Sequence, residues 1–194
     1  MSARLATIAL IALFTLTACS RDEVRSYRVP KEASPKMPGV TAEAAFPAAT
    51  GTAAAMTWQA PDHWEDQGAS GMRRGSFQIP GDGDATADLS IIAFPGDAGG
   101  MAANVNRWRG QVGLPSLLPA QIDAEIEHPD TAYLHVDLVT MTGETAGVPT
   151  RIDGAIFNYG GESWFIKFMG PAEIVAREND NFRAFVQTVA PAHR

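Results

Sequence analysis

The sequence predicts an α+β fold in which an antiparallel sheet of about five or six strands is flanked by helices. From residue 72 onward, several segments have the length and composition of strands, with apolar residues recurring at every second position in 86–94, 131–139 and 162–170. Consecutive strand candidates are joined by tight-turn signals such as Gly160-Gly161, and strands joined in this way pair antiparallel. Two other segments carry apolar stripes with the helical period, which are typical of helices that dock on a sheet.

The first strand candidates lie between residues 56 and 94. The opening segment 56–67 is expected to contain a strand that ends at Pro61, where a turn follows. Segments 72–80 and 86–94 are predicted to be strands around the turn-forming run 81–85. Both faces of the second of these strands carry apolar residues, so both faces are expected to be partly buried.

A helix is predicted over 101–112, because four apolar residues form one narrow stripe on a helical wheel: Met101, Val105, Trp108 and Val112. Gly113 is expected to stop this helix, and Pro115 prevents the helix from resuming. Segment 119–126 is a candidate for a second, shorter helix.

Three more strands and a closing helix complete the expected fold. The strand candidates are 131–139, 150–159 and 162–170, and the last two are joined by the glycine pair named above. A helix is predicted over 179–189, where apolar residues recur at helical spacing: Phe182, Phe185, Val186 and Val189. Helices on the sheet then give an α/β/α sandwich.

The N-terminus has the features of a secretory signal. Arg4 precedes the apolar run 5–14, which is too short for a stable membrane span but fits the hydrophobic region of a signal peptide. Residues 16–19, Leu-Thr-Ala-Cys, resemble a bacterial lipobox. The resemblance implies a signal peptide over 1–18, cleavage between Ala18 and Cys19, and attachment of lipid to the Cys19 thiol.

Lipid attachment would place the chain in the bacterial cell envelope, facing the periplasm. Two or more acyl chains give stable anchoring, whereas one chain holds a protein only marginally. Ser20, in place of an aspartate, slightly favours the outer membrane. Segment 19–55 is rich in alanine, proline, threonine and glycine, so we expect a flexible tether there and a globular domain over 56–194.

Composition excludes several partners and chemistries. The net charge is −7 and the chain has no lysine or arginine cluster, so nucleic acid is not an expected partner. The expected partners are the membrane, reached through the lipid, and an envelope protein. Cys19 is the only cysteine, so its lipidation leaves no thiol for a disulfide or a nucleophile. No cofactor is expected.

The polar side of the predicted helix 101–112 is a tentative ligand-binding surface. Asn104, Arg107, Arg109 and Gln111, preceded by glycines, are of the types that bind an anion or a peptide. Because the preceding segment is neither a P-loop nor a dinucleotide-binding turn, hydrogen bonds that tie the helix to neighbouring loops are the favoured interpretation.

No catalytic or metal site is predicted. Neither a nucleophile elbow nor a pair of histidines at metal-binding spacing is present. His135 and Asp137 share one face of a predicted strand, and a polar pair is favoured over an acid–base couple. Asp82, Asp84 and Asp88 lack the spacing of a calcium loop and are expected to belong to an ordinary acidic turn.

Two motifs carry a resemblance to known proteins. They are Trp58…Pro61…Trp64 and the run Asn104-Val105-Asn106-Arg107-Trp108-Arg109, continued by Gln111-Val112-Gly113-Leu114-Pro115. With these motifs the chain resembles an uncharacterised group of bacterial lipoproteins, and the order of its elements resembles the PsbP-like fold. That resemblance implies a non-catalytic binding or accessory protein. The alternative is a carrier or sensor that binds a small apolar or anionic ligand between sheet and helix.

Overall fold

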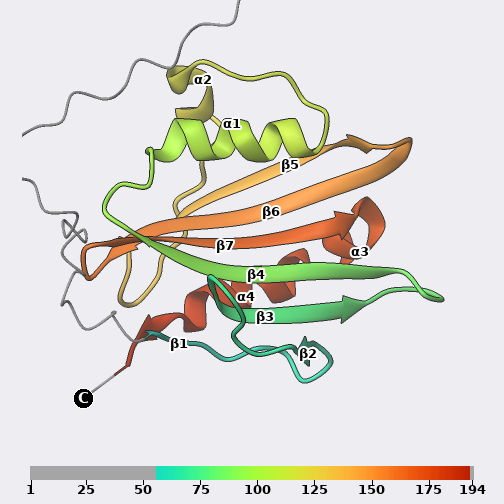
Figure 1. Ribbon diagram of the computed structural model, residues 1–194, viewed down its shortest axis with the longest axis horizontal. Helices are drawn as coiled ribbons and strands as arrows, with labels where there is room; N and C mark the ends of the chain where they lie inside the picture. The colour runs from blue at the N-terminus through green and yellow to red at the C-terminus, as the bar shows by residue number, and fades with distance from the viewer. Residues whose placement is uncertain (1–55, 193–194) are drawn as a thin grey trace, which may run out of the picture. The chain divides into compact units, whose positions relative to one another are not determined.

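The computed structural model describes residues 56–192, and the predicted α+β class with an antiparallel sheet is confirmed. Six strands form the main sheet in the order β2-β3-β4-β7-β6-β5, and all neighbours are antiparallel (Figure 1). The strands of this sheet are β2 (Glu65–Asp66), β3 (Arg73–Pro80), β4 (Thr86–Pro95), β5 (Asp137–Thr145), β6 (Val148–Tyr159) and β7 (Glu162–Pro171). A separate pair joins β1 (Met56–Thr57) to β8 (Ala190–Pro191).

Tight turns connect β5 to β6 and β6 to β7. Gly160 and Gly161 have φ angles of 62° and 79°, which is the left-handed region that a two-residue hairpin turn requires. Ala146 and Gly147, with φ angles of 50° and 81°, form the corresponding turn between β5 and β6. The predicted hairpin 150–170 is therefore confirmed, and a second hairpin precedes it.

The connection from β4 to β5 crosses the sheet and carries two helices, α1 (Met101–Gln111) and α2 (Pro119–Asp123). The predicted apolar stripe faces the sheet, where Val105 and Trp108 are buried together with Val112, which directly follows the last residue of α1. The core on this side is formed by Val105, Trp108, Val112, Ile122, Val139, Met141, Ile152, Ile156 and Phe165.

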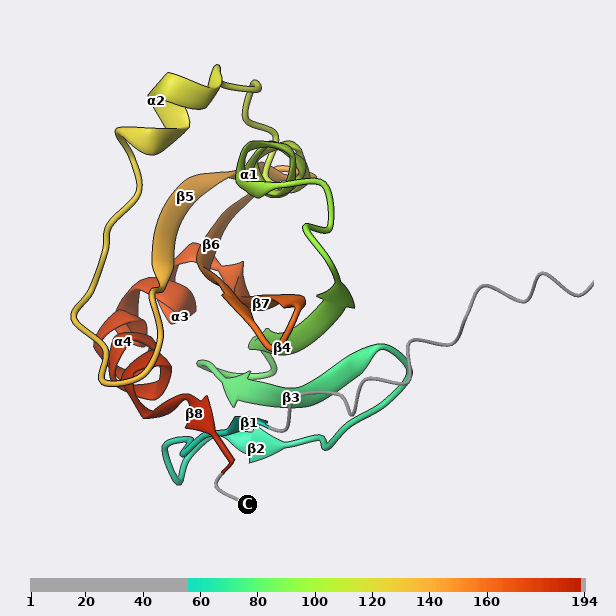
Figure 2. The ribbon, with the colours of Figure 1, turned by 90° about the vertical axis from the view of Figure 1, so that its left-hand side faces the viewer.

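The other face of the sheet is covered by α3 (Ala172–Arg177) and α4 (Asn179–Thr188). Figure 2 shows these helices on the side of the sheet opposite to α1 and α2, as expected for an α/β/α sandwich. Alternate residues of β7 divide between the two cores, because Trp164, Ile166 and Phe168 pack under α3 and α4 while Phe165 packs under α1.

The prediction of a strand over 131–139 is wrong in its bounds. The strand begins at Asp137 and continues to Thr145, while residues 131–136 form no ladder. The alternation of apolar residues that predicted this strand reflects real burial, because Val136 and Leu138 are both buried in one core. Burial gives this pattern whether or not the backbone pairs with a neighbouring strand. The C-terminal end of β5 was not predicted, because most residues of segment 140–145 are polar.

Smaller differences concern the two ends of the domain. The expected strand before Pro61 is the two-residue β1, and the expected turn is present as a hydrogen bond from Trp64 N to Pro61 O. The helix over 179–189 is α4, which ends at Thr188, and the short α3 precedes it.

The predicted signal peptide, Ala18, Cys19 and the tether lie outside the described residues. Within residues 56–192, no helix has the length and apolar character to cross a membrane.

Candidate functional site

A pocket of about 240 Å³ lies where the start of α1 meets the beginning of β5 and the turn between β6 and β7. These segments come together toward the left-hand side of Figure 1. The residues that line it are Asp97, Gly100, Met101, His135, Asp137, Ile156, Phe157, Asn158, Ser163 and Phe165. The pocket is therefore bounded by both the helix and the sheet, as a ligand site of this fold class is expected to be.

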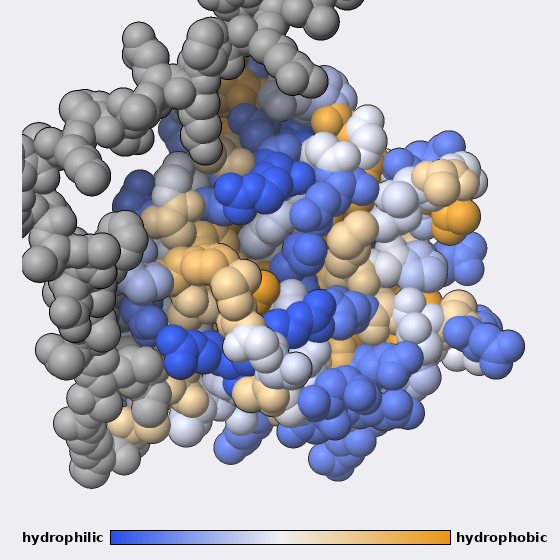
Figure 3. All heavy atoms as spheres, viewed as in Figure 1, coloured by the Kyte–Doolittle hydropathy of each residue, from blue (hydrophilic) through white to orange (hydrophobic). Residues whose placement is uncertain are grey.

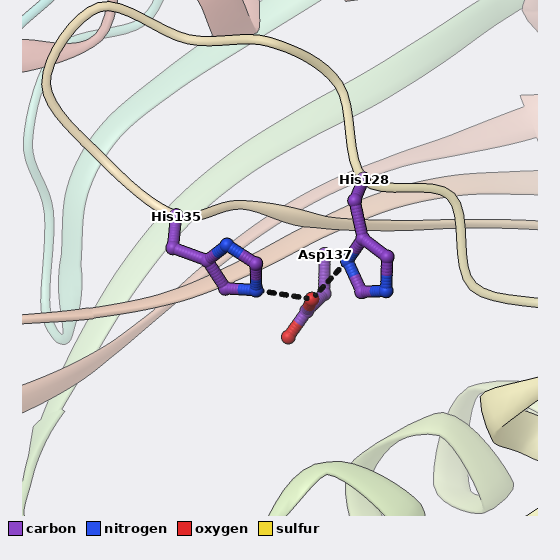
Figure 4. Close-up of side chains that lie close together, drawn as sticks. All are labelled: His128, His135 and Asp137. Carbon is purple, nitrogen blue, oxygen red and sulfur yellow. Dashed lines mark ion pairs between the residues drawn. The ribbon is translucent and has the colours of Figure 1, made fainter.

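Two histidines converge on one carboxylate beside this pocket, and of the three residues His135 and Asp137 line it, whereas His128 does not. His128 Nδ1 lies 2.9 Å from Asp137 Oδ1, and His135 Nε2 lies 3.5 Å from the same oxygen. Figure 4 shows both rings turned toward Asp137, one from each side. The two imidazoles also lie near each other, with ring centroids 5.2 Å apart and 24° between their planes.

Backbone pairing explains how His128 reaches this position. Glu127 and Leu138 form an antiparallel bridge, in which each N–H donates to the other residue's carbonyl oxygen at 2.9 Å and 2.8 Å. In this register His128 stands opposite Asp137, and opposed side chains of an antiparallel pair share a face. His135 precedes the first residue of β5 by two positions, and its Nε2 lies near Asp137 Oδ1, so its ring is on the same side.

Contacts to the rest of the fold hold both ends of the loop 128–136. Arg183 on α4 donates to the carboxylate of Glu127 at 2.8 Å, beside His128. Val136 is buried in the core under α3 and α4, beside His135. The histidines are thus attached to positioned backbone, although their own side chains are 57% and 79% exposed.

The charge of the pocket favours a cation. Two carboxylates, Asp97 and Asp137, are among the lining residues, and neither lysine nor arginine is. The Ser163 hydroxyl lies 2.7 Å from the carbonyl oxygen of Gly96 and 2.8 Å from Asn158 Oδ1, so hydroxyl and amide oxygens add to the polar lining. Oxygen and imidazole nitrogen atoms of this kind bind metal ions or cationic groups.

Two residues of the tentative ligand-binding surface shape the start of α1. Asn104 is buried, and its Nδ2 donates to the carbonyl oxygens of Ala98 and Gly100 at 3.0 Å and 2.7 Å. Arg107 is exposed and donates to Asn104 Oδ1 at 2.8 Å. Asn104 thereby holds the loop that borders the pocket, although neither side chain is among the pocket's lining residues.

The other two residues of that surface lie farther along the helix. Arg109 is buried and donates to the carbonyl oxygen of Pro115 at 2.8 Å, and its guanidinium also lies 3.3 Å from a Glu125 oxygen. The Gln111 side-chain oxygen accepts a hydrogen bond from Lys167 Nζ at 2.9 Å. These contacts tie α1 to the following loop and to β7, which is the kind of role that the favoured interpretation assigns to them.

The acidic turn predicted at 81–85 lies between β3 and β4. The prediction that Asp88 belongs to this turn is wrong, because Asp88 lies in β4, where both of its carboxylate oxygens accept hydrogen bonds from Arg73 at 2.7 Å and 3.0 Å. Asp82 and Asp84 are exposed.

A broader hollow lies near Met72 and Phe94, and Figure 3 shows pale orange, apolar residues over the end of β4 that leads to α1. Its other lining residues are Ala69, Gly71, Arg73, Arg74, Ala93 and Pro95. This hollow is open and is lined only by apolar groups and arginines, so it offers fewer kinds of binding group to a ligand than the pocket beside α1 does.

A carboxylate far from the pocket has the largest electrostatic perturbation. Glu178 Oε2 accepts hydrogen bonds from His63 at 2.9 Å, Trp64 at 3.2 Å and Asn181 at 2.7 Å. Burial by itself raises the pKa of Glu178. The hydrogen bonds, together with the charge of His63, outweigh burial and lower the pKa from 4.5 to about 2. This network joins the segment before β2 to α4 and has a structural role.

Sequence reasoning paired His135 with Asp137 but missed His128. The sequence contains one signal that favours the third partner, because Pro129 and Asp130 are turn formers placed directly after His128. A turn there brings the chain back alongside itself. The register that sets His128 opposite Asp137 cannot be read from the turn alone.

Comparison with known proteins adds likenesses of fold. No protein-family model matches the sequence, and no curated protein matches it. Among solved structures, LpqN of Mycobacterium tuberculosis, described as involved in cell envelope biogenesis, is similar at 12% identity with a TM-score of 0.48. That match covers 74% of this chain and 88% of LpqN.

Two other structures are similar in the same way. The PsbP protein CyanoP of Synechocystis sp. PCC 6803 matches at 11% identity and a TM-score of 0.34, over 74% of this chain and 96% of that protein. A protein of Bacteroides thetaiotaomicron matches at 14% identity and a TM-score of 0.46, over 72% of this chain. The chain spans about half of the Bacteroides protein, since the match covers 46% of it. A PsbP protein is therefore among the similar structures, and likenesses of this size say nothing of function.

Proposed function

We propose that this chain is a lipid-anchored, non-catalytic accessory protein of the bacterial cell envelope, which faces the periplasm and binds a ligand or partner through its α+β domain. The observation that carries the proposal is the order of residues at the N-terminus. A positive charge, an apolar run and a small residue before Cys19 follow one another as in a lipoprotein signal. Lipid on Cys19 would hold the domain at a membrane surface.

The domain supports a binding role. The three histidine side chains within residues 56–192 contact carboxylates: His63 contacts Glu178, and His128 and His135 contact Asp137. Within residues 56–192, none of these histidines has a hydrogen bond to a serine or threonine hydroxyl, which is the contact that activates such a nucleophile. The pocket beside α1 offers room for a small ligand, but its two carboxylates, Asp97 and Asp137, fit a cation and not the apolar or anionic ligand of the alternative.

Anchoring is tested by Cys19→Ala in a bacterial host. We expect the wild-type chain to incorporate labelled palmitate and to fractionate with membranes. The variant is expected to incorporate no label and to accumulate as an unprocessed or mislocalised precursor, because the sulfur that accepts the lipid is gone. Ser20→Ala is the matched control and retains both label and membrane association. Labelling that survives Cys19→Ala would contradict the proposal, as would a wild-type chain in the cytosol that retains residues 1–18.

A further inference from the structure

We infer that His128, His135 and Asp137 form an exchangeable binding site for a divalent transition-metal ion of the zinc type. The site names a ligand for the pocket described above, and in this respect it rests on the proposed binding function. Its geometry is independent of the lipid anchor. The three side chains meet only in the folded chain, since His128 and His135 are on opposite sides of a loop.

The positions of the donor atoms fit one small ion. One ligand atom from each residue lies within 4.8 Å of the other two. Zinc binds imidazole nitrogen and carboxylate oxygen at about 2.0–2.2 Å, so neighbouring ligands of a tetrahedral ion are about 3.3 Å apart. The two nitrogen–oxygen separations of 2.9 Å and 3.5 Å bracket that value. Both imidazoles are more than half exposed, so they have space to rotate toward an ion between the three atoms.

The donor set selects the kind of ion. Two imidazoles and one carboxylate suit zinc, copper or nickel, whereas calcium and magnesium take mainly oxygen ligands. Asp97 adds a second carboxylate to the lining of the same pocket, which raises its attraction for a cation. The ion therefore meets one compensating charge among its ligands and another nearby.

The exposure of the site indicates exchange with solution. Structural zinc sites are closed by four protein ligands, while three ligands leave one coordination position open. His128 and His135 are more than half exposed, so an ion reaches them without unfolding the domain. The backbone bridge of Glu127 with Leu138 keeps the ligands near one another before the ion arrives. This preorganisation reduces the ordering cost of binding.

The test is calorimetric titration of the full chain with Zn²⁺, after chelator treatment and in a preparation that carries no polyhistidine tag. We expect one ion per chain, and an affinity that falls at least about tenfold in His135→Gln and in His128→Gln. His135 is the most exposed ligand, so thermal unfolding of its variant is expected to match the wild type. His63→Gln is the matched control, because His63 also faces a carboxylate but lies at the Glu178 network, and it is expected to bind Zn²⁺ as the wild type does.

Visible absorption of the Co²⁺-loaded chain gives a second measurement. We expect bands that depend on both His128 and His135, and that Zn²⁺ displaces. The inference is overturned if the wild type binds no Zn²⁺, or if binding is unchanged in both single variants. It is also overturned if His63→Gln weakens binding as much as His135→Gln does. None of these results bears on palmitate labelling, so failure of the metal site and failure of the anchor are distinguished.

Discussion

Glu178 shows how a single buried carboxylate joins segments that are far apart in sequence. Its partners His63 and Trp64 precede it by 115 and 114 residues, and Glu178 as a whole is only 5% exposed. A charge buried to this extent is stable only when its oxygens are hydrogen-bonded. Trp64 belongs to the tryptophan motif of the sequence, so part of the role of that motif is to donate this hydrogen bond.

The lowered pKa of Glu178 predicts an acid-sensitive contribution to stability. Because its pKa is about 2 in the fold and 4.5 ordinarily, the contribution is complete above pH 4.5 and is lost as the pH falls toward 2. We expect Glu178→Gln to lower the free energy of unfolding at pH 7 by up to about 3 kcal/mol. Chemical denaturation as a function of pH measures this. Glu173→Gln, on the exposed side of α3, is the control, and an equal effect of both variants would refute the assignment.

At the scale of elements, the close packing of α1 on the sheet depends on a glycine, Gly154 of β6, which has no side chain. Trp108 lies over Gly154 of β6, and a Cβ atom added at Gly154 would overlap the indole ring. The ring also packs edge-on against Phe165 of β7, with centroids 6.3 Å apart. A large side chain on the helix is thus accommodated by the smallest residue on the strand, which allows α1 to approach the sheet closely.

This complementarity predicts a non-additive pair of substitutions. Gly154→Ala is expected to lower the free energy of unfolding by about 1–3 kcal/mol through overpacking, and Trp108→Ala by about 3–5 kcal/mol through the cavity it leaves. In the double variant the added methyl group has space, so Gly154→Ala should cost little there. Denaturant unfolding of the four proteins measures the coupling.

The control for this cycle is Gly110→Ala, which changes an exposed glycine of the same helix. No atom lies within 4 Å of its added Cβ, so the substitution is expected to stabilise the helix by about 0.5–1 kcal/mol. Additive effects of the Gly154 and Trp108 substitutions would show that the two residues do not share one contact.

At the scale of the whole molecule, the buried cores lie within the domain that starts near Met56. The two cores are built from residues between Trp64 and Val189, with Met56 and Trp58 packed at the edge of one of them. Segment 19–55 has few large apolar residues, and it is therefore predicted to contribute little to folding.

We expect a chain that begins at Thr50 to unfold with the same free energy as the full Cys19→Ala chain, within about 0.5 kcal/mol. A chain that begins at Pro61 loses the β1–β8 pairing and the packing of Met56 and Trp58. It should be less stable by at least about 1.5 kcal/mol, the value of one buried apolar side chain. Guanidinium unfolding of the three proteins tests this. A large loss at Thr50 would show that the preceding segment is part of the folded unit.

The sequence by itself determined the features that depend on near neighbours along the chain. The period of two in β4 and β7, the period of 3.6 in α1 and α4, and the glycine turn between β6 and β7 each require only residues that are near in sequence, and each of these predicted elements is present. The lipoprotein signal, including Cys19, was also predicted from a local pattern, and it lies outside the residues that the structure describes.

Tertiary structure decided the features in which distant residues meet. Residue periodicity says which face of a strand is apolar but not where pairing starts, so the start of β5 at Asp137 was missed. The same limit hid the approach of His128 to Asp137 and the pairing of Trp64 with Glu178. Each of these depends on how loops close and how helices pack on the sheet. Loop closure and helix packing are set by the free energy of the whole folded chain, so no short segment of the sequence is enough to predict them.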